Sequence, residues 1–305
     1  MLEYPKEFNH IIEKAKSFNR PWQVAVAGSN SENILKGVFA AQEEGFAEPI
    51  LIGNFKKTKE MLENLGLADR KYDFYPVSSA TSPVQYAIEM IQAGSADVLV
   101  RGNVQTRDFL LPIMNKSNHL IEEGKLVTHI NVMKFKEYPR LISVSDCTLL
   151  VEPSIEQRED VIRNMCEALS HFGIKKPNIA LLSLVEKPSF HMRDTVEAQT
   201  IVMHHQEEPI ANCNLFGPIT YDLIISKEAA RLKHYECEYC GEFDGIVVPN
   251  LLAGNLICKF WDAHLTGTGC GVLVGAKIPV AISGRSEPPT HAFLSLAASL
   301  ATYSH

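Results

Sequence analysis

Residues 23–54 read QVAVAGSNSENILKGVFAAQEEGFAEPILIGN. Two nearly continuous apolar runs, at 23–28 and 49–54, flank a stretch in which apolar residues recur at spacings of three and four. A short apolar run is typical of a strand buried on both faces, and the intervening spacing is typical of an amphipathic helix. The segment therefore predicts a strand, a helix and a second, parallel strand in a sheet covered by helices.

The same alternation continues through the first half of the chain. Further strands are expected at 72–77, 97–102, 126–133 and 140–147, with helices at 55–66 and 82–94. A serine or threonine stands where each N-cap is expected, and a glycine stands where each helix is expected to stop: Ser31, Thr58 and Ser82, then Gly45, Gly66 and Gly94.

A second α/β unit is expected to begin between Cys147 and Pro153, where a new series of alternating helical stretches and apolar runs starts. Its expected helices and strands alternate as before: helices at 154–173, 192–205 and 253–265, and strands at 176–184, 212–217, 244–250 and 269–276. The last helix, at 290–303, has no place in this second unit, so we expect it to return to the first. No Gly-rich, Ser-rich or Pro-rich linker separates the halves, which favours a tight crossing near residue 150.

Composition narrows the class of protein. The 305 residues are 46% hydrophobic and 21% charged, which is ordinary for a globular chain. A net charge of -7 provides no basic field for nucleic acid or an anionic membrane. Seven cysteines, an odd number, favour reduced thiols. The first residues, MLEYPKEFNHIIEKAK, are unlike a signal or transit peptide, and no apolar run approaches the roughly 20 residues of a membrane helix. We expect a soluble cytoplasmic protein.

One candidate phosphate site is the segment VRGNVQTR at 100–107. It follows an expected strand and opens an expected helix, where free backbone N–H groups and the helix dipole can bind phosphate. Arg101, Thr106 and Arg107 would add charge and a hydroxyl. The alternative is an ordinary turn with a capping threonine and two surface arginines. Neither a Walker motif nor G-x-G-x-x-G occurs in the chain.

Two later segments also place polar groups after an apolar strand. PNLLAGN at 249–255 carries Asn250 and Asn255, which could donate amide N–H groups to a ligand. The alternative is that one asparagine caps the helix and the other faces solvent. GAKIPVAISGRS at 275–286 delivers Ser283 and Arg285 to the carboxyl end of a strand, where open α/β sheets bind ligands.

Glu287 and His291 follow this last segment as two possible proton acceptors near an arginine. The alternative is an exposed ion pair of little energetic value. A single C-x-x-C, Cys237 to Cys240 with His234 nearby, lacks the second ligand pair of a zinc site. We interpret it as a surface loop, and the alternative is labile metal binding or redox chemistry.

Taken together, these motifs resemble the phosphate acetyl/butyryltransferase family, and most closely its phosphate butyryltransferase branch. The resemblance covers most of residues 95–300. It depends on the segments RGNVQT, PNLLAGN and VGAKIPVAISGRS, with support from Ser145-Asp146-Cys147, NCNLFGPITYD (212–222) and SKEAA (226–230).

The resemblance implies a fold like that of isocitrate and isopropylmalate dehydrogenases: two three-layer α/β/α domains with mostly parallel sheets and an active-site cleft between them. The first domain would comprise residues 1–148 plus 284–305, and the second residues 149–283. The implied reaction is reversible transfer of a short-chain acyl group, butyryl favoured, between coenzyme A and inorganic phosphate. Both are substrates, and no cofactor or metal is expected. A homo-oligomer is expected.

Residue roles follow from the resemblance together with the chemistry of the motifs. Gln105 and Thr106 would contact the acyl phosphate, and Asn255 would line the cleft. Ser283 and Arg285 would hold phosphate or coenzyme A, and Glu287 or His291 would act as the base. Candidate catalytic residues are thus Arg285, Ser283, Glu287 and His291, and candidate substrate or phosphate ligands are Arg101, Gly102, Gln105, Thr106, Arg107 and Asn255.

Two departures from the family pattern leave alternatives open. Leu111 stands where the family commonly has an arginine, and Pro288-Pro289 belong to a turn where some members have an aspartate. A non-catalytic protein that binds coenzyme A or an acyl phosphate is one alternative. A metal-dependent hydroxy-acid dehydrogenase is another, but its aspartate cluster would have to come from Asp146, Asp222 and Asp262, which are isolated in the sequence.

Overall fold

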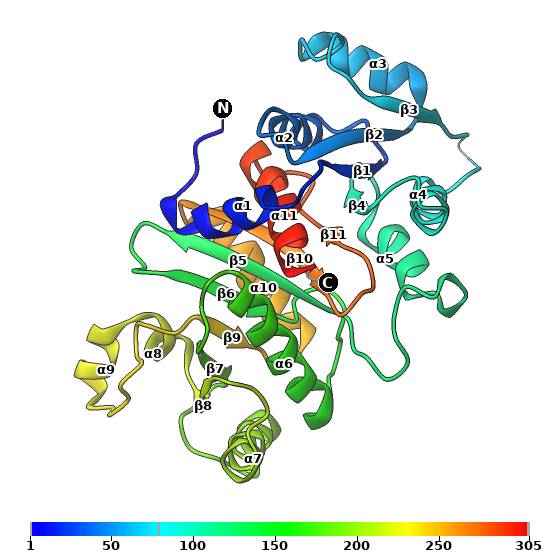
Figure 1. Ribbon diagram of the computed structural model, residues 1–305. Helices are drawn as coiled ribbons and strands as arrows, with labels where there is room; N and C mark the ends of the chain where they lie inside the picture. The colour runs from blue at the N-terminus through cyan, green and yellow to red at the C-terminus, as the bar shows by residue number, and fades with distance from the viewer. Residues whose placement is uncertain (1, 79, 304–305) are drawn as a thin grey trace. The chain divides into compact units, whose positions relative to one another are not determined.

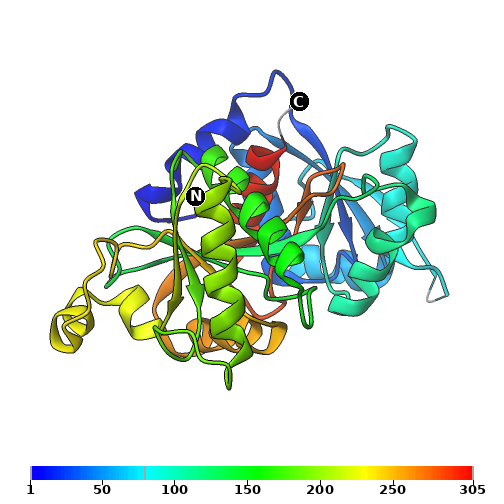
Figure 2. The ribbon, with the colours of Figure 1, turned by 90° about the horizontal axis from the view of Figure 1, so that it is seen from below.

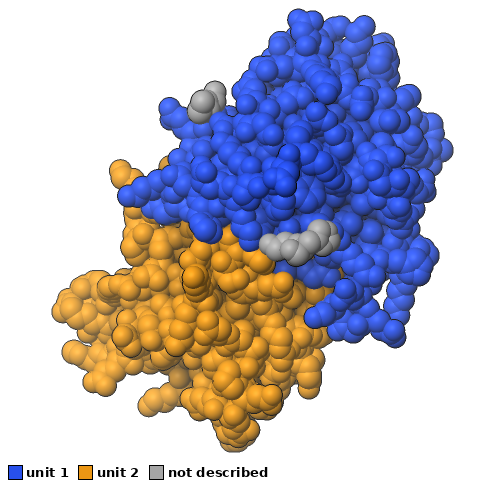
Figure 3. All heavy atoms as spheres, viewed as in Figure 1, with its two compact units in different colours: residues 1–125, 269–305 blue, residues 126–268 orange. Residues whose placement is uncertain are grey.

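A computed structural model describes residues 2–78 and 80–303 of the chain. It divides into unit 1, residues 1–125 and 269–305, and unit 2, residues 126–268 (Figure 3). These boundaries differ from the predicted ones at 148/149 and 283/284. Strand β6 (Leu141–Ser145) lies in unit 2 because it pairs with β9 (Gly245–Val247). Strand β11 (Val280–Ala281) lies in unit 1 because it pairs with β4 (Val98–Arg101).

Unit 1 contains a mainly parallel sheet, with strand order β3-β2-β1-β4-β11-β10 (Figure 1). The strands not yet introduced are β1 (Trp22–Ala27), β2 (Ala47–Gly53), β3 (Asp73–Pro76) and β10 (Gly267–Val274). β1 is parallel to both β2 and β4, whereas β10 is antiparallel to β11. The carboxyl ends of β1 and β4 therefore meet at one edge, where the candidate phosphate turn begins.

Helices cover both faces of this sheet. They are η1 (Lys6–Phe8), α1 (Asn9–Lys16), α2 (Glu32–Glu43), α3 (Phe55–Asn64), α4 (Pro83–Gln92), α5 (Thr106–Met114), η2 (Lys116–Asn118) and α11 (Pro289–Thr302). α11 packs against α1 and α2, while α4 packs on β1 and contacts α5 (Figure 1). Gly37 on α2 permits close packing, because a Cβ there would lie 2.7 Å from the Cβ of Ala292 on α11.

The predicted helix boundaries hold better at the C-termini than at the N-termini. Gly45, Gly66 and Gly94 follow their helices with φ of 86°, 65° and 72°, as the stop signal requires. Ser82 caps α4 by accepting a hydrogen bond from the Gln85 N–H at 3.3 Å. The prediction for Thr58 is wrong, because this residue is buried inside α3, whose cap is Asn54. Ser31 precedes α2 without a side-chain capping bond.

In unit 2 the strand order is β5-β6-β9-β7-β8, and β5 and β6 are antiparallel while the later pairs are parallel. Its remaining elements are β5 (Thr128–Phe135), α6 (Ile155–His171), β7 (Asn178–Leu182), α7 (Arg193–Glu207), β8 (Asn214–Ile219), α8 (Tyr221–Ile225), α9 (Lys227–Lys233) and α10 (Leu251–His264). On one face Gly245 makes room for α6, since a Cβ there would lie 2.3 Å from Sδ of Met165. On the other, Ile246 joins the cluster that contains Trp261 of α10. Figure 2 gives a second view of these elements.

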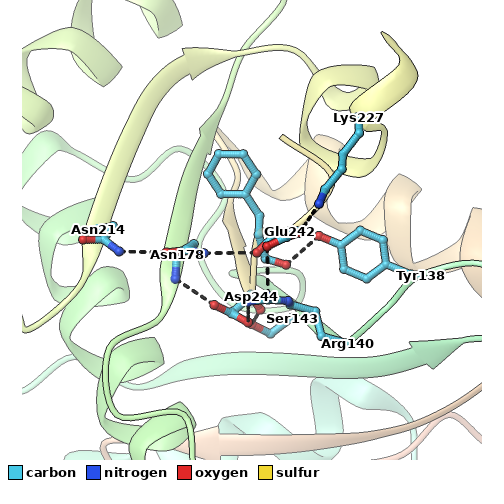
Figure 4. Close-up of polar contacts among 9 residues, drawn as sticks. Tyr138, Arg140, Ser143, Asn178, Asn214, Lys227, Glu242 and Asp244 are labelled. Atoms are coloured by element: carbon cyan, nitrogen blue, oxygen red, sulfur yellow. Dashed lines mark hydrogen bonds and ion pairs between the residues drawn. The ribbon is translucent and has the colours of Figure 1, made fainter. Parts of the chain in front are cut away.

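A polar network ties together the amino ends of the parallel strands in unit 2 (Figure 4). The Asp244 carboxylate accepts hydrogen bonds from the Asn178 N–H at 2.8 Å and from Arg140 at 3.1 Å. Asn214 donates to the Asn178 side chain at 2.8 Å, and the Ser143 hydroxyl donates to the Asp244 carbonyl at 2.8 Å. Because ligands bind at the opposite, carboxyl edge of such sheets, this network stabilises the fold.

The alternating pattern of the sequence is thus confirmed as an α/β fold with mostly parallel sheets. All seven cysteines carry free thiols. The surface-loop prediction for the C-x-x-C is wrong at Cys240, which is only 3% exposed and belongs to the core of unit 2. Within residues 2–78 and 80–303, no helix has the length and apolar character needed to cross a membrane.

Candidate functional site

The turn after β4 is fixed by two close backbone contacts. Gly102 N–H donates to the Ala27 carbonyl at 2.9 Å, and Asn103 N–H donates to the Gly28 carbonyl at 2.7 Å. A Cβ on Gly102 would lie 2.2 Å from the Gly28 oxygen, so no other residue fits there without moving backbone. The turn therefore enters α5 in one defined position, beside the end of β1.

Arg101 holds the same turn from within the protein. It is 6% exposed, and its Nε and Nη2 donate to the Val104 carbonyl at 3.1 and 2.9 Å. Its Nη1 donates to the Ser283 carbonyl at 3.4 Å, which joins the turn after β4 to the residues that follow β11. Burial, and then the positive charge of Arg285, lower the pKa of the Arg101 guanidinium. Two cationic groups therefore lie close together at this edge.

Arg285 is the exposed member of the pair. Its Nη2 donates to Oε1 of Gln105 at 3.2 Å, although the two residues are 180 positions apart in the chain. Gln105 is the N-cap residue of α5 but makes no side-chain cap to its own helix. Ser283 is buried and contributes its carbonyl to Arg101. Arg285 is thus held beside the N-terminus of α5, where the positive end of the helix dipole adds to its charge.

Glu287 and His291 have different surroundings. A Cβ on Gly284 would lie 2.3 Å from Oε1 of Glu287, so the glycine gives this carboxylate room to fold back over the turn. His291 is 5% exposed, and its Nε2 accepts a hydrogen bond from the Gly269 N–H at 3.0 Å. Its Nδ1 faces Glu287 at 3.5 Å. Because the accepting nitrogen of His291 is occupied, Glu287 is the better placed proton acceptor of the two.

The other predicted residues on α5 lie at or near its surface. Thr106 is half-buried in the first turn, and Arg107 is exposed beside it. Leu111 is 55% exposed, so it presents an apolar side chain to solvent. No interaction assigns a ligand role to Arg107, and that role stays a prediction.

A second polar cluster surrounds Asp146, at the carboxyl end of β6 in unit 2. Its carboxylate accepts backbone N–H groups from His129 at 2.6 Å, Thr148 at 2.7 Å and Leu149 at 2.6 Å. Thr148 Oγ1 lies 2.8 Å from Nδ1 of His129. The sequence placed Asp146 in a motif of the family resemblance and among the aspartates of the dehydrogenase alternative. His129 was not predicted, because the pairing of β5 with β6 brings it there.

Asn255 joins this cluster from α10. Its Nδ2 donates to the Cys147 carbonyl at 3.4 Å, and the side chain is otherwise exposed. Asn250 is the N-cap of α10, since its Oδ1 accepts the Ala253 N–H at 3.1 Å. Gly254 lets α10 approach, because a Cβ there would lie 2.5 Å from the Asp146 carbonyl. The capping interpretation is therefore confirmed for Asn250.

The Cys147 thiol is buried, and its sulfur lies 3.0 Å from Nδ1 of His129. Its hydrogen bond with Cys258, followed by burial, raises the pKa of the Cys147 thiol well above its ordinary value. A raised thiol pKa lowers the fraction of thiolate at neutral pH.

A family model described as "Phosphate acetyl/butaryl transferase" matches residues 76–291 of the chain. The chain belongs to this family. It is 28% identical to the phosphate butyryltransferase of Clostridium acetobutylicum, over 92% of this chain and 93% of that one. It is 26% identical to the phosphate acetyltransferase of Thermotoga maritima, over 95% and 97% of the two chains. This acetyl/butyryl transferase family member is therefore an acyltransferase.

Solved structures agree with this family assignment. A branched-chain phosphotransacylase from Enterococcus faecalis V583 matches with a TM-score of 0.78 at 25% identity, covering 93% of this family member and 100% of that chain. A 4-hydroxythreonine-4-phosphate dehydrogenase from Klebsiella pneumoniae matches with a TM-score of 0.52 at 11% identity, covering 92% and 99%. The second likeness concerns the fold alone, and it agrees with the predicted dehydrogenase-like architecture.

The aspartates that a dehydrogenase would need for a metal are used elsewhere in this transferase. Asp146 accepts backbone N–H groups, Asp222 pairs with Lys233 at 2.9 Å, and Asp262 pairs with Lys259 at 3.2 Å. Among the residues that the structure describes, no group of three or more His, Cys, Asp or Glu side chains could hold a metal ion.

Proposed function

We propose that this protein transfers a short-chain acyl group, butyryl in preference to acetyl, between coenzyme A and inorganic phosphate. The family assignment supports the reaction class. The butyryl preference is supported by similarity to a phosphate butyryltransferase and to a branched-chain phosphotransacylase, although an acetyltransferase also matches over most of the chain.

The observation that carries the proposal is the approach of two arginines to the N-terminus of α5. Arg285 is exposed and bonded to Gln105, while Arg101 is buried and fixed by carbonyl oxygens. We infer that Arg285 binds the phosphoryl oxygens through its planar guanidinium, with the Thr106 hydroxyl and the first N–H groups of α5 as further donors. Arg101 and Gly102 hold the turn in place, and the positive charge of Arg101 lies near that of Arg285.

The thiol of coenzyme A must lose a proton before it can attack. A free thiol has a pKa of about 8.5, so little thiolate exists at neutral pH. We infer that Glu287 takes this proton, because its carboxylate is positioned over Gly284 and its charge acts on Arg101. A general base contributes roughly 10²- to 10⁴-fold.

The transfer itself requires no covalent enzyme intermediate. The thiolate sulfur attacks the acyl carbonyl carbon, forming the C–S bond, and the bond between that carbon and the bridging phosphate oxygen breaks. The departing phosphate carries the electron pair, and Arg285 stabilises its negative charge. We assign a donor role toward the developing oxyanion to Ser283. No metal or redox cofactor takes part in this sequence.

The decisive test compares butyryl-CoA with acetyl-CoA in phosphate buffer, with thiol release followed by a chromogenic disulfide. The proposal predicts phosphate-dependent release of coenzyme A, faster from butyryl-CoA and unaffected by EDTA. Loss of activity in EDTA would reject the metal-free reaction. Tight binding of butyryl-CoA with no turnover at any phosphate concentration would instead identify a non-catalytic binding protein.

We further propose that the protein is a cytoplasmic homo-oligomer. Leu252, Leu256 and Phe260 recur every four residues on α10 and are 77%, 64% and 50% exposed, which forms an apolar stripe. Light scattering on Leu256→Glu checks this: the mass should fall to that of one chain, and a wild-type protein that is already monomeric would contradict it. The free thiols support a reducing compartment.

A further inference from the structure

The core of unit 2 contains a cavity of about 200 Å³ that the proposed reaction does not use. Residues of β5, β6, α8 and α10 line it. Its floor consists of side chains that are at most 6% exposed: Phe135, Tyr138, Ile142 and Trp261. Its rim includes Ile225 and Leu265, which are 37% and 38% exposed. The cavity is therefore a depression in a packed core with a partly open mouth.

Two polar groups give this apolar cavity a chemical preference. The Tyr221 hydroxyl accepts a hydrogen bond from Nε1 of Trp261 at 2.7 Å, which leaves the phenolic proton available. No hydrogen bond within residues 2–78 and 80–303 uses that proton. The Tyr138 hydroxyl, by contrast, already donates to the Phe243 carbonyl at 2.7 Å. Glu137 lines the cavity as its one ionisable carboxylate and is exposed.

We propose that this cavity binds a small uncharged molecule whose apolar body carries one carbonyl or hydroxyl oxygen. The volume sets the size, because an apolar cavity of about 150 Å³ accommodates benzene. The oxygen would accept the free proton of Tyr221, while the ring or branched chain would pack against Trp261 and Phe135. The charge of Glu137 would reject a carboxylate of the same shape.

The two tryptophans of the chain, Trp22 and Trp261, make binding directly observable. In a Trp22→Phe background, the remaining indole stands in the floor of the cavity and reports its occupancy by fluorescence. Cyclohexanone is a suitable probe, and we expect a saturable change in emission with Kd on the order of 1 mM. Cyclohexanecarboxylate should bind at least about 10-fold more weakly, because burying its charge in an apolar cavity costs free energy, and the nearby Glu137 charge adds to that cost.

Two substitutions localise the ligand. Ile225→Phe adds a ring at the mouth and should weaken cyclohexanone binding about 10-fold or more. Leu232→Phe is the matched control, since Leu232 on α9 is 64% exposed and does not line the cavity; it should bind as the parent does. Tyr221→Phe removes the donor and should weaken the ketone about 5- to 10-fold. Thermal unfolding of each variant verifies its fold.

Three results would overturn the proposal. The first is a linear, unsaturable response of Trp261 emission to cyclohexanone. The second is equal affinity for the ketone and the carboxylate. The third is a change in the solution mass of Ile225→Phe with no change in ketone affinity, which would assign the cavity to a second copy of the chain. Because no readout depends on acyl transfer, the result stands apart from the proposed enzyme activity.

Discussion

Replacement of Arg285 by alanine tests whether this residue binds the anionic substrate or only stabilises the fold. Arg285 is exposed, and its side chain donates a hydrogen bond to Gln105 at 3.2 Å. A single exposed bond of this kind contributes at most about 1 kcal/mol to the free energy of unfolding. The loss of one charged donor from the transition state costs about 3 to 4 kcal/mol, or several hundred-fold in kcat/KM. Activity should therefore fall far more than stability.

The assay is kcat/KM for butyryl-CoA and for phosphate, alongside a thermal melt of each variant. Arg285→Lys should lie between the wild type and Arg285→Ala, because lysine keeps the charge but loses the planar two-oxygen grip. Arg231→Ala is the matched control, since Arg231 is an exposed arginine on α9 that pairs with Glu228. A wild-type kcat/KM for Arg285→Ala with both substrates would refute the role of this residue.

Three further predictions concern the scaffold. Gly102→Ala should lower both Tm and kcat/KM, because its Cβ would lie 2.2 Å from the Gly28 oxygen; an unchanged Tm would show that the turn adapts freely. Asp97 is partly buried, which opposes ionisation, but hydrogen bonds from Arg20 and the Gln23 N–H lower its pKa on balance. Asp97→Asn should thus cost about 1 kcal/mol of unfolding free energy at neutral pH, and this difference should vanish as pH falls through the lowered pKa; denaturant melts at several pH values check it. Cys240→Ser should cost about 1 to 3 kcal/mol in urea unfolding by burying a hydroxyl, and an equal midpoint would contradict that.

The alternation of strands and helices could be predicted because, in most of this chain, short apolar runs form strands and stretches with apolar residues at spacings of three and four form helices. The helix ends at Gly45 and Gly66 could also be predicted. A glycine in the left-handed backbone conformation ends a helix through local geometry alone, without a contact from elsewhere in the fold. Thr58 could not be placed, because its hydroxyl turns inward to meet Ser29 Oγ at 3.0 Å, a contact 29 residues away. The helices α8 and α9 are too short for periodicity to show.

The candidate site divides in the same way. Arg101 and Arg285 could be nominated from the sequence because both follow apolar strands, and the carboxyl ends of strands meet at one edge. Their different burial could not be foreseen, since it depends on the Val104 and Ser283 carbonyls. The sequence indicated that His291 could act as a base. In the structure its acceptor nitrogen is occupied by a hydrogen bond from the Gly269 N–H, which could not be predicted because it depends on the tertiary fold.

Phosphorus NMR during turnover of butyryl-CoA distinguishes acyl transfer to phosphate from hydrolysis. With phosphate and EDTA present, we expect one butyryl phosphate formed for each coenzyme A released, and no release when phosphate is omitted. Release of coenzyme A without phosphate, with butyrate as the only acyl product, would make the protein a hydrolase and rule out the proposed transfer.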